Sequence, residues 1–353
     1  MVSLRPDLAE VEPYDSPQLP ATRRMNTNES PYGPPESVVE ALQAALRDAA
    51  LNRYPDRDAV ALTDALAARW AWPRAGVWIA NGSNEVLMHV FLAFGGPGRS
   101  ALTFEPSYNL HSLIPRIALT DVVHLRRGGA FEIDAAAAVA HVEEHRPDVV
   151  VVCSPNNPTG STAPRDLVEG LLRAAPGLVV VDEAYAEFAP ADASAVPLLP
   201  RHENLVVVRT FSKAWSLAGM RLGYMLAAPD LVRKMAVVKL PYHLSVLAQA
   251  AGVAVLAAEE ETMRCVQAIV SERERMVREL RALRFRVVPS DANFLLFGTD
   301  VIDGELLQRC LHEEGVLVRA YPNVPALREW ARVTVGLPED NEDFLRTLGS
   351  VMA

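Results

Sequence analysis

Short apolar runs alternate with amphipathic segments along most of the first 240 residues. The apolar runs are Val77–Ala80, Ala101–Phe104, Val122–Leu125, Val149–Cys153, Val179–Val181, Leu205–Arg209 and Leu222–Leu226. The segments with helical spacing are Ser37–Ala49, Ala59–Trp70, Ser83–Phe94, Asp134–His145 and Arg165–Ala174. Strands that are hydrophobic throughout and separated by helices indicate a mainly parallel sheet covered on both faces. We therefore expect an α/β fold with a large first domain.

The pattern changes after about residue 260. A long charged helix is predicted at Glu260–Leu283, and a shorter one near Gly304–Glu314. Short strands are predicted at Arg286–Pro289, Asn293–Phe297, Val316–Arg319 and Arg332–Val335. Because 353 residues exceed what one core usually supports, we divide the chain into three parts. These are an N-terminal arm (1–27) packing on the small domain, a large domain (28–258) and a small C-terminal α+β domain (259–353).

Composition and charge limit what this protein is expected to bind and where it is expected to work. A net charge of −10 argues against binding to nucleic acid or to an anionic membrane surface. The longest apolar stretch, Ser245–Ala258, is too short to cross a bilayer and is predicted to be a buried helix. The N-terminus carries charges where a signal peptide needs an apolar region. Three widely spaced cysteines match no metal-binding spacing, which favours reduced thiols and a cytoplasmic protein without a metal.

Lys213 is the first candidate for chemistry. It follows the apolar run Leu205–Arg209 in a turn that is rich in serine and glycine. An amine in such a turn is well placed to form a Schiff base with a carbonyl cofactor. Ser212 and Arg221 would then hold a phosphate on that cofactor, because guanidinium groups match phosphate oxygens. Taken alone, the segment fits a surface lysine and arginine beside a loop equally well.

Two further turns follow apolar runs and would face the same ligand. Asp182 ends one run, at the sheet edge where α/β enzymes bind ligands, and its carboxylate would pair with a protonated pyridine nitrogen. Asn157 lies in a turn rich in proline, from which its amide would reach a ring oxygen shared with Tyr185. The alternatives are a helix cap or solvated residue for Asp182 and an ordinary turn for Asn157.

Three other positions complete the candidate ligand site. Ser83 and Asn84 follow Gly82 at the start of a predicted helix, where free N–H groups and the helix dipole bind phosphate. The same residues also make an ordinary helix cap. Tyr108 follows a strand and would stack on a planar cofactor, and Tyr54 lies in a polar turn before the first strand. Each tyrosine also fits a place in the core or at its rim.

Together these segments resemble the fold-type I pyridoxal-phosphate-dependent aminotransferases, and more narrowly the histidinol-phosphate aminotransferase family. The resemblance runs almost end to end. The strings that carry it are Glu12-Pro-Tyr14, Asn28-Glu-Ser-Pro-Tyr-Gly33, Arg53-Tyr-Pro-Asp56, Gly82-Ser-Asn-Glu85, Pro106-Ser-Tyr108, Ser154-Pro-Asn-Asn-Pro-Thr-Gly160, Asp182-Glu-Ala-Tyr185, Ser212-Lys213, Leu217-Ala-Gly-Met-Arg221 and Lys239-Leu-Pro-Tyr-His-Leu-Ser245.

The resemblance implies pyridoxal 5'-phosphate as cofactor and a role for each candidate. Lys213 binds the cofactor and moves the substrate proton, and Asp182 pairs with the pyridine nitrogen. The remaining cofactor contacts are Asn157 and Tyr185 at the ring hydroxyl, Ser83, Asn84, Ser212 and Arg221 at the phosphate, and Tyr108 stacked on the ring. In this family the residue matching Tyr54 reaches the partner subunit's cofactor, which implies a homodimer.

The resemblance also implies the substrate site. Arg332 binds the substrate α-carboxylate, and Arg319 holds the phosphate of histidinol phosphate at the distal end, where Tyr14 assists. Asn28 belongs to the same set. Glutamate, the usual amino donor, uses the same pocket with its side-chain carboxylate on Arg319, since one guanidinium can accept either anion.

The expected function is ping-pong transamination in histidine biosynthesis. It interconverts L-histidinol phosphate and 2-oxoglutarate with imidazole-acetol phosphate and glutamate. Two rivals on the same fold stay open, an aromatic amino acid aminotransferase and a related phospho-amino-acid decarboxylase. One motif points elsewhere: His141-Val-Glu-Glu-His145 matches an inverted zinc-peptidase pattern. With no third ligand apparent, it is interpreted as a solvated helix face.

Overall fold

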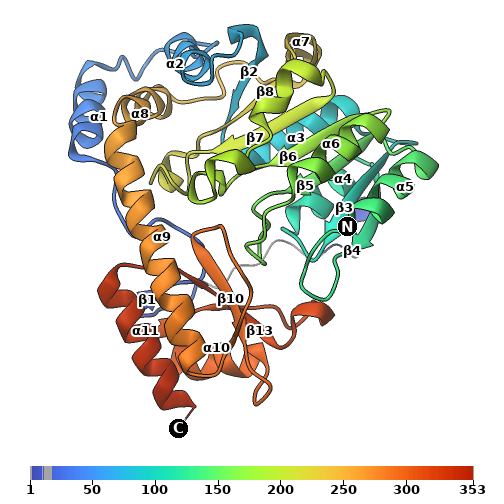
Figure 1. Ribbon diagram of the computed structural model, residues 1–353. Coiled ribbons are helices and arrows are strands. Elements are labelled where there is room, and N and C mark those ends of the chain that lie inside the picture. Colours follow the sequence, from blue (N-terminus) through green and yellow to red (C-terminus); the bar gives the residue numbers. More distant parts are fainter. Residues whose placement is uncertain (1, 10, 12–17, 353) are drawn as a thin grey trace.

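The computed structural model describes residues 2–9, 11 and 18–352, which form two parts with separate sheets (Figure 1). The upper part in the figure contains the large sheet and the lower part contains the C-terminal elements. The long helix α9 (Glu259–Ala282) runs down one side of the molecule and joins them. The α/β class predicted from the sequence is confirmed.

The large sheet has seven strands, and most of them run parallel. Their order is β2 (Val77–Ala80), β8 (Gly223–Ala227), β7 (Leu205–Thr210), β6 (Leu178–Asp182), β5 (Val149–Cys153), β3 (Ser100–Glu105) and β4 (Asp121–Arg126). The strands from β7 to β4 are parallel, whereas β8 is antiparallel to both of its neighbours. All seven strands coincide with predicted ones to within a residue at each end.

Helices accompany this sheet throughout. They are α1 (Glu36–Asp48), α2 (Val60–Trp70), α3 (Ser83–Phe94), α4 (Leu110–Ile117), α5 (Ala135–His145), α6 (Arg165–Ala174), α7 (Pro229–Met235) and α8 (Val246–Ala257). Along each central strand, alternate side chains pack into two different hydrophobic clusters, one on each face of the sheet. Val181 and Val207 belong to one hydrophobic cluster, and Val180 and Val206 belong to another. Burial on both faces explains why these strands are apolar throughout.

The second part is built on a four-stranded antiparallel sheet. Its order is β12 (Arg319–Ala320), β13 (Trp330–Thr334), β10 (Phe294–Gly298) and β9 (Arg286–Val287), accompanied by α10 (Gly304–Glu313) and α11 (Pro338–Val351). One prediction was wrong here. The run 316–319 is not a single strand, because β11 (Val316–Leu317) pairs with β1 (Arg23–Arg24) while β12 pairs with β13.

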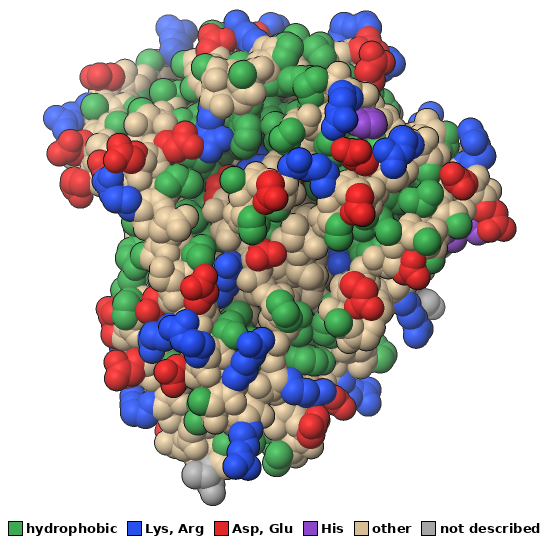
Figure 2. All heavy atoms as spheres, in the orientation of Figure 1, with side chains coloured by type: hydrophobic (Ala, Val, Ile, Leu, Met, Phe, Trp, Pro, Cys, Tyr) green, Lys and Arg blue, Asp and Glu red, His purple; other side chains and the backbone are tan. Residues whose placement is uncertain are grey.

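The N-terminal segment touches both parts. Arg5 donates from Nη2 to the carbonyl of Ile117 at the end of α4, 3.1 Å away. Further along, β1 adds to the C-terminal part through β11. The division at residues 27/28 and 258/259 stays a prediction. Within the described residues, every helix is too short or too polar to cross a membrane. Basic and acidic side chains are interspersed on the face that Figure 2 shows.

Candidate active site

The carboxyl ends of β5, β6 and β7 meet at one edge of the large sheet and form the floor of a pocket. Parallel strands present their C-terminal residues and the following turns at the same edge, where α/β folds bind ligands. The pocket is lined by Thr27, Asn28, Ser83, Asn84, Tyr108, Cys153, Asn157, Asp182, Ala184, Tyr185, Thr210, Ser212, Lys213, Arg221 and Arg332. The structure thus brings together every cofactor residue proposed from the sequence except Tyr54.

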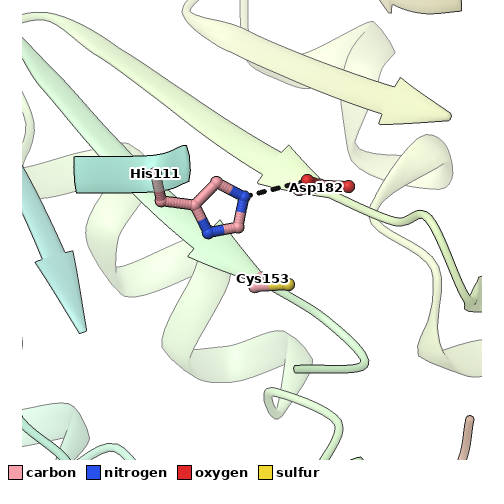
Figure 3. Close-up of side chains that lie close together, drawn as sticks. All are labelled: His111, Cys153 and Asp182. Carbon is pink, nitrogen blue, oxygen red and sulfur yellow. Dashed lines mark hydrogen bonds and ion pairs between the residues drawn. The ribbon is translucent and has the colours of Figure 1, made fainter. Parts of the chain in front are cut away.

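Asp182, the last residue of β6, is almost fully buried at this edge. His111 on α4 donates from Nε2 to its Oδ2 over 2.9 Å (Figure 3). The other ring nitrogen of His111 lies 3.3 Å from the hydroxyl of Ser107. A second carboxylate oxygen, Oδ1, accepts the backbone N–H of Ala184. These contacts hold an anionic carboxylate toward the pocket, and the sequence reasoning missed His111.

Cys153 lies beside this pair, at the register position opposite Asp182 (Figure 3). The ligand atoms of His111, Cys153 and Asp182 lie within 4.8 Å of one another. However, burial and the nearby Asp182 carboxylate raise the pKa of the Cys153 thiol far above its ordinary value. A protonated thiol is a poor metal ligand, and His111 and Asp182 are already bonded to each other. His111 and Asp182 therefore form a hydrogen-bonded pair, and the thiol of Cys153 beside them donates to the carbonyl of Pro155.

Tyr185 presents its hydroxyl to the pocket from the turn after β6. The amide of Asn28 donates to this hydroxyl over 3.0 Å, and the amide of Asn157 lies 3.5 Å away. Burial raises the pKa of Tyr185 above its ordinary value, so the hydroxyl keeps its proton and remains a donor. Asn28 adopts a positive φ of 55°, a conformation that asparagine tolerates better than most residues. A ring oxygen placed here would meet a phenol and an amide.

Lys213 reaches the centre of the pocket from the turn after β7. Its Nζ donates to the carbonyl of Thr27 over 2.8 Å. Burial, with the cations of Arg332 and Arg221, lowers the pKa of this lysine to about 7. An amine with such a pKa is substantially uncharged at neutral pH, so it can act as a nucleophile and as a proton carrier.

One end of the pocket is built for an anion. Helix α3 begins at Ser83, after Gly82 with a φ of 86°. A Cβ at Gly82 would lie 2.9 Å from Nη2 of Arg221, so glycine lets that guanidinium approach the helix start. The hydroxyl of Ser212 lies 3.5 Å from Nη1 of Arg221. Backbone N–H groups, hydroxyls and a guanidinium together match the oxygens of a phosphate.

A second pocket opens beside the first and shares Tyr108, Asn157 and Arg332 with it. Its remaining lining is Glu105, Pro106, Ser107, Asn109, Ser112, Pro158, Arg319, Tyr321, Val324 and Leu327. Arg319 on β12 stands directly opposite Arg332 on β13 in the antiparallel register. Like charges placed opposite each other across two strands repel. An anion bound between them would remove that repulsion.

Arg332 is nearly buried and held by oxygen atoms of distant segments. Its Nη1 donates to Oδ1 of Asn157, and its Nη2 donates to the carbonyl of Asn26, both at 2.5 Å. Its Nε is buried and has no hydrogen-bond partner among the residues that the structure describes. A buried donor without a partner is costly, which favours a ligand oxygen beside this guanidinium.

Two predicted site residues lie elsewhere. Tyr54 is 81% exposed and stacks on Tyr242, with ring centroids 4.6 Å apart. It does not line either pocket of its own subunit. Tyr14 lies outside the described residues. Besides His111, sequence reasoning missed Tyr321, which lines the second pocket two residues after Arg319. The sequence does contain a signal for Tyr321: it lies two residues after Arg319, and residues two apart on an extended segment face the same side.

A half-buried lysine of lowered pKa, a buried carboxylate and an anion cradle on a mainly parallel sheet match a pyridoxal-phosphate-dependent enzyme. The family model for aminotransferase class I and II matches residues 23–348, and the chain belongs to that family. Within it, the chain is a member of the histidinol-phosphate aminotransferases, as curated relatives at 43–48% identity over nearly the full length show.

Two relatives and one solved structure illustrate the similarity. The histidinol-phosphate aminotransferase of Thermobifida fusca is 47% identical over 350 residues, covering 98% of this chain and 94% of the relative. That of Nocardia farcinica is 48% identical over 352 residues, covering 97% and 90%. The structure of histidinol-phosphate aminotransferase from Sinorhizobium meliloti in complex with pyridoxal-5'-phosphate has a TM-score of 0.90 at 25% identity, covering 100% and 98%.

The residues present fit pyridoxal phosphate. Asp182 offers a buried carboxylate for a pyridinium nitrogen, and Lys213 offers an amine of lowered pKa for an aldehyde. The anion cradle of Ser83, Ser212 and Arg221 suits the phosphate. The cofactor predicted from the sequence is confirmed by the family and by the solved relative.

We expect the cofactor-free protein to capture pyridoxal phosphate about tenfold faster at pH 8 than at pH 6. Lys213 has a pKa lowered to about 7, so its uncharged, attacking form accumulates as pH rises through that value and then levels off. Stopped-flow absorbance measures the rate, and a free primary amine gives the cofactor's own pH dependence for subtraction. A corrected rate that keeps climbing to about pH 10 would show an ordinary lysine.

Proposed function

We propose that this protein transfers the amino group between L-histidinol phosphate and 2-oxoglutarate, with glutamate as the usual donor. From L-histidinol phosphate and 2-oxoglutarate the products are imidazole-acetol phosphate and glutamate, and glutamate acts as the donor in the opposite direction. The observation that carries the proposal is the pair Arg319 and Arg332, which stand opposite each other and line the pocket beside Lys213. The full-length relatives are histidinol-phosphate aminotransferases, so neither an aromatic aminotransferase nor a decarboxylase is favoured.

Each residue of the site has a proposed task. When bound, pyridoxal phosphate supplies an electron sink that makes the substrate α-proton acidic. Lys213 binds the cofactor aldehyde and moves the proton, since its amine can both accept and return one near neutral pH. Asp182 keeps the ring nitrogen protonated, oriented by His111. Asn157 and Tyr185 donate to the ring oxygen.

The anionic groups of the two substrates are assigned to the two arginines. Arg332 is held by Asn157 and by the carbonyl of Asn26, which leaves its buried Nε for the α-carboxylate of glutamate. Arg319 lies farther along the second pocket and is proposed to bind the phosphate or the distal carboxylate. Asn28 positions the Tyr185 hydroxyl from the substrate side.

Replacing Arg319 by alanine tests the substrate. We expect kcat/KM for histidinol phosphate to fall about 10- to 100-fold, because a charged hydrogen bond contributes roughly 1.5–3 kcal/mol. The value for phenylalanine should change far less. Steady-state assays with both substrates measure the effect. The matched control is Arg286→Ala, which changes an exposed arginine paired with Glu329 outside both pockets. If Arg319→Ala loses less than about threefold with histidinol phosphate, the substrate assignment fails while transamination stands.

We propose a homodimer in which Tyr54 completes the partner's cofactor site. Tyr54 stacks on Tyr242, and exposed apolar side chains occur close by in the same two stretches of sequence, namely Val60, Val237, Leu240 and Val246. A set of large apolar side chains of this kind marks an association surface. Sedimentation equilibrium should give twice the mass of one 38.5 kDa chain. Tyr54→Ala should weaken cofactor retention without loosening the subunit's own pocket, and a stable active monomer would contradict the proposal.

A cytoplasmic setting is part of the same proposal. The three cysteines, Cys153, Cys265 and Cys310, are free thiols in the structure. Free thiols are typical of proteins that work in reducing compartments.

A further inference from the structure

A buried ion cluster lies beneath the strand ends that carry the active site. It consists of Glu183, Glu187, Arg209 and Trp215, which we call the Arg209 cluster. Arg209 contacts Glu183 at 2.5 Å and Glu187 at 3.0 Å. The side chains of all three ions are at most 5% exposed, and Trp215 is fully buried. None of the four residues lines the cofactor or substrate pocket.

The sheet register explains why these charges meet. Asp182 on β6 pairs with Val208 on β7, and one step farther the backbone N–H of Glu183 donates to the carbonyl of Val208. Because side chains alternate along a strand, Asp182 points to the face that holds His111. Glu183 and Arg209 therefore share the opposite face. Asp182 and Glu183 are therefore neighbours in sequence whose carboxylates lie on opposite faces of the sheet at the end of β6. The first faces the cofactor site and the second pairs with Arg209.

A second link ties the turn of Tyr185 to the turn of Lys213. Oε1 of Glu187, two residues after Tyr185, accepts from Nη1 of Arg209 at 3.0 Å. The same oxygen accepts the indole N–H of Trp215 at 3.1 Å, and Trp215 lies two residues after Lys213. One carboxylate oxygen thus holds both turns of the active site at a fixed separation.

Stability alone does not account for this arrangement. Burial lowers the pKa of Arg209, but the carboxylates of Glu183 and Glu187 outweigh it and raise the pKa above its ordinary value, so the cation persists. Nevertheless Nε of Arg209 is buried and has no hydrogen-bond partner within the described part of the chain. Well-packed hydrophobic side chains of similar volume are often as stabilising as a buried ion pair. What an ion cluster adds is a defined geometry, because its hydrogen bonds are directional.

We propose that the Arg209 cluster is a positioning device for catalysis, which fixes Lys213 relative to Asp182 and Tyr185 from the far face of the sheet. The inference rests on the proposed function, in which those three residues bind the cofactor. Its members touch neither cofactor nor substrate and act through the strand ends and turns. A displacement of about 1 Å at a reacting group can cost 10²-fold in rate, so loosening the cluster should be visible in cofactor capture.

Trp215→Phe tests the role with little change in shape, because it removes the indole N–H that Glu187 accepts. The matched control is Trp70→Phe. Trp70 stacks over Arg209 at 4.7 Å, and its indole N–H bonds the hydroxyl of Tyr224 instead of Glu187. Both changes delete one indole N–H in the same region. Only the first breaks the link between the two turns.

The measurements separate positioning from folding. For Trp215→Phe we expect cofactor-free protein to capture pyridoxal phosphate about tenfold more slowly. We also expect a similar fall in kcat, KM for histidinol phosphate within about twofold, and a shift in the pH at which the bound cofactor's absorbance changes. Trp70→Phe should stay within about twofold of wild type in every cofactor readout, although both variants lower Tm.

Equal effects of the two variants on capture, or a lower Tm for Trp215→Phe with capture unchanged, would overturn the positioning role. If Trp215→Phe does not fold, Glu187→Gln carries the test. It keeps the side chain's shape, removes one of the two carboxylate charges that Arg209 faces, and should slow capture at least about threefold. Capture at the wild-type rate would also overturn the role. The wild-type protein, measured alongside, tests the proposed function separately. If the wild type itself showed no transaminase activity, the proposed function would be contradicted rather than the positioning role.

Discussion

Lys213→Ala is expected to abolish transamination, with a loss of at least about 10⁴-fold, while part of the cofactor stays bound. The variant removes the only amine in the pocket, whereas the phosphate cradle and Asp182 remain. Single-turnover mixing with glutamate measures the residual rate, and ultrafiltration followed by absorbance measures retained cofactor. The chain offers a clear control, because it contains only three lysines.

Lys234→Ala is the matched change at an exposed lysine paired with Asp230, and it should behave as wild type. The third lysine, Lys239, also has a lowered pKa through burial, so it is the rival that must be excluded. Borohydride trapping followed by peptide mapping distinguishes the three. If the reduced cofactor were found attached to Lys239, or if Lys213→Ala turned over at a near-normal rate, Lys213 would not be the catalytic lysine.

Asp182→Asn is expected to lower the rate of the glutamate half-reaction by about 10²–10⁴-fold. Removing one partner of a buried ion pair costs roughly 3–5 kcal/mol, and an amide cannot keep a pyridine nitrogen protonated. The substitution is nearly isosteric, so His111 keeps an oxygen to which it can donate. Stopped-flow absorbance of the bound cofactor gives the rate and reports whether its spectrum has changed.

The control for this substitution is Asp134→Asn. Asp134 caps α5 on the protein surface by accepting from the N–H of Ala137, and asparagine caps helices about as well as aspartate. It should leave both rate and spectrum unchanged. A rate for Asp182→Asn within about threefold of wild type would mean that the ring nitrogen has another partner.

The sequence predicted the large sheet well for a physical reason. Strands such as Val149–Cys153 are covered on both faces, so every position is apolar and the run is unmistakable. Helix α4 was missed because it has only eight residues and contains Pro115. Without that helix nothing placed His111 near Asp182, although the two lie 71 positions apart and bond in the structure.

Pairing between distant segments was the other limit. The apolar run at 316–319 looks like one strand, yet its two ends belong to different sheets. Val316 and Leu317 pair with β1, whereas Arg319 pairs with β13. Neither partner is visible from the run itself. The same register places Arg319 opposite Arg332. Sequence reasoning could name both arginines through family resemblance, but their places opposite each other on two strands appear only once the strands are paired.

The segment 26–28 has a consequence for how the enzyme is made. The carbonyl of Thr27 accepts from Lys213, that of Asn26 accepts from Arg332, and Asn28 donates to Tyr185. A growing chain emerges N-terminus first, so these groups leave the ribosome long before Arg332 does. A nascent chain can build its central sheet early, but its catalytic centre closes only when synthesis is almost finished. Ribosome-bound fragments ending before β13 should therefore be unable to turn over substrate.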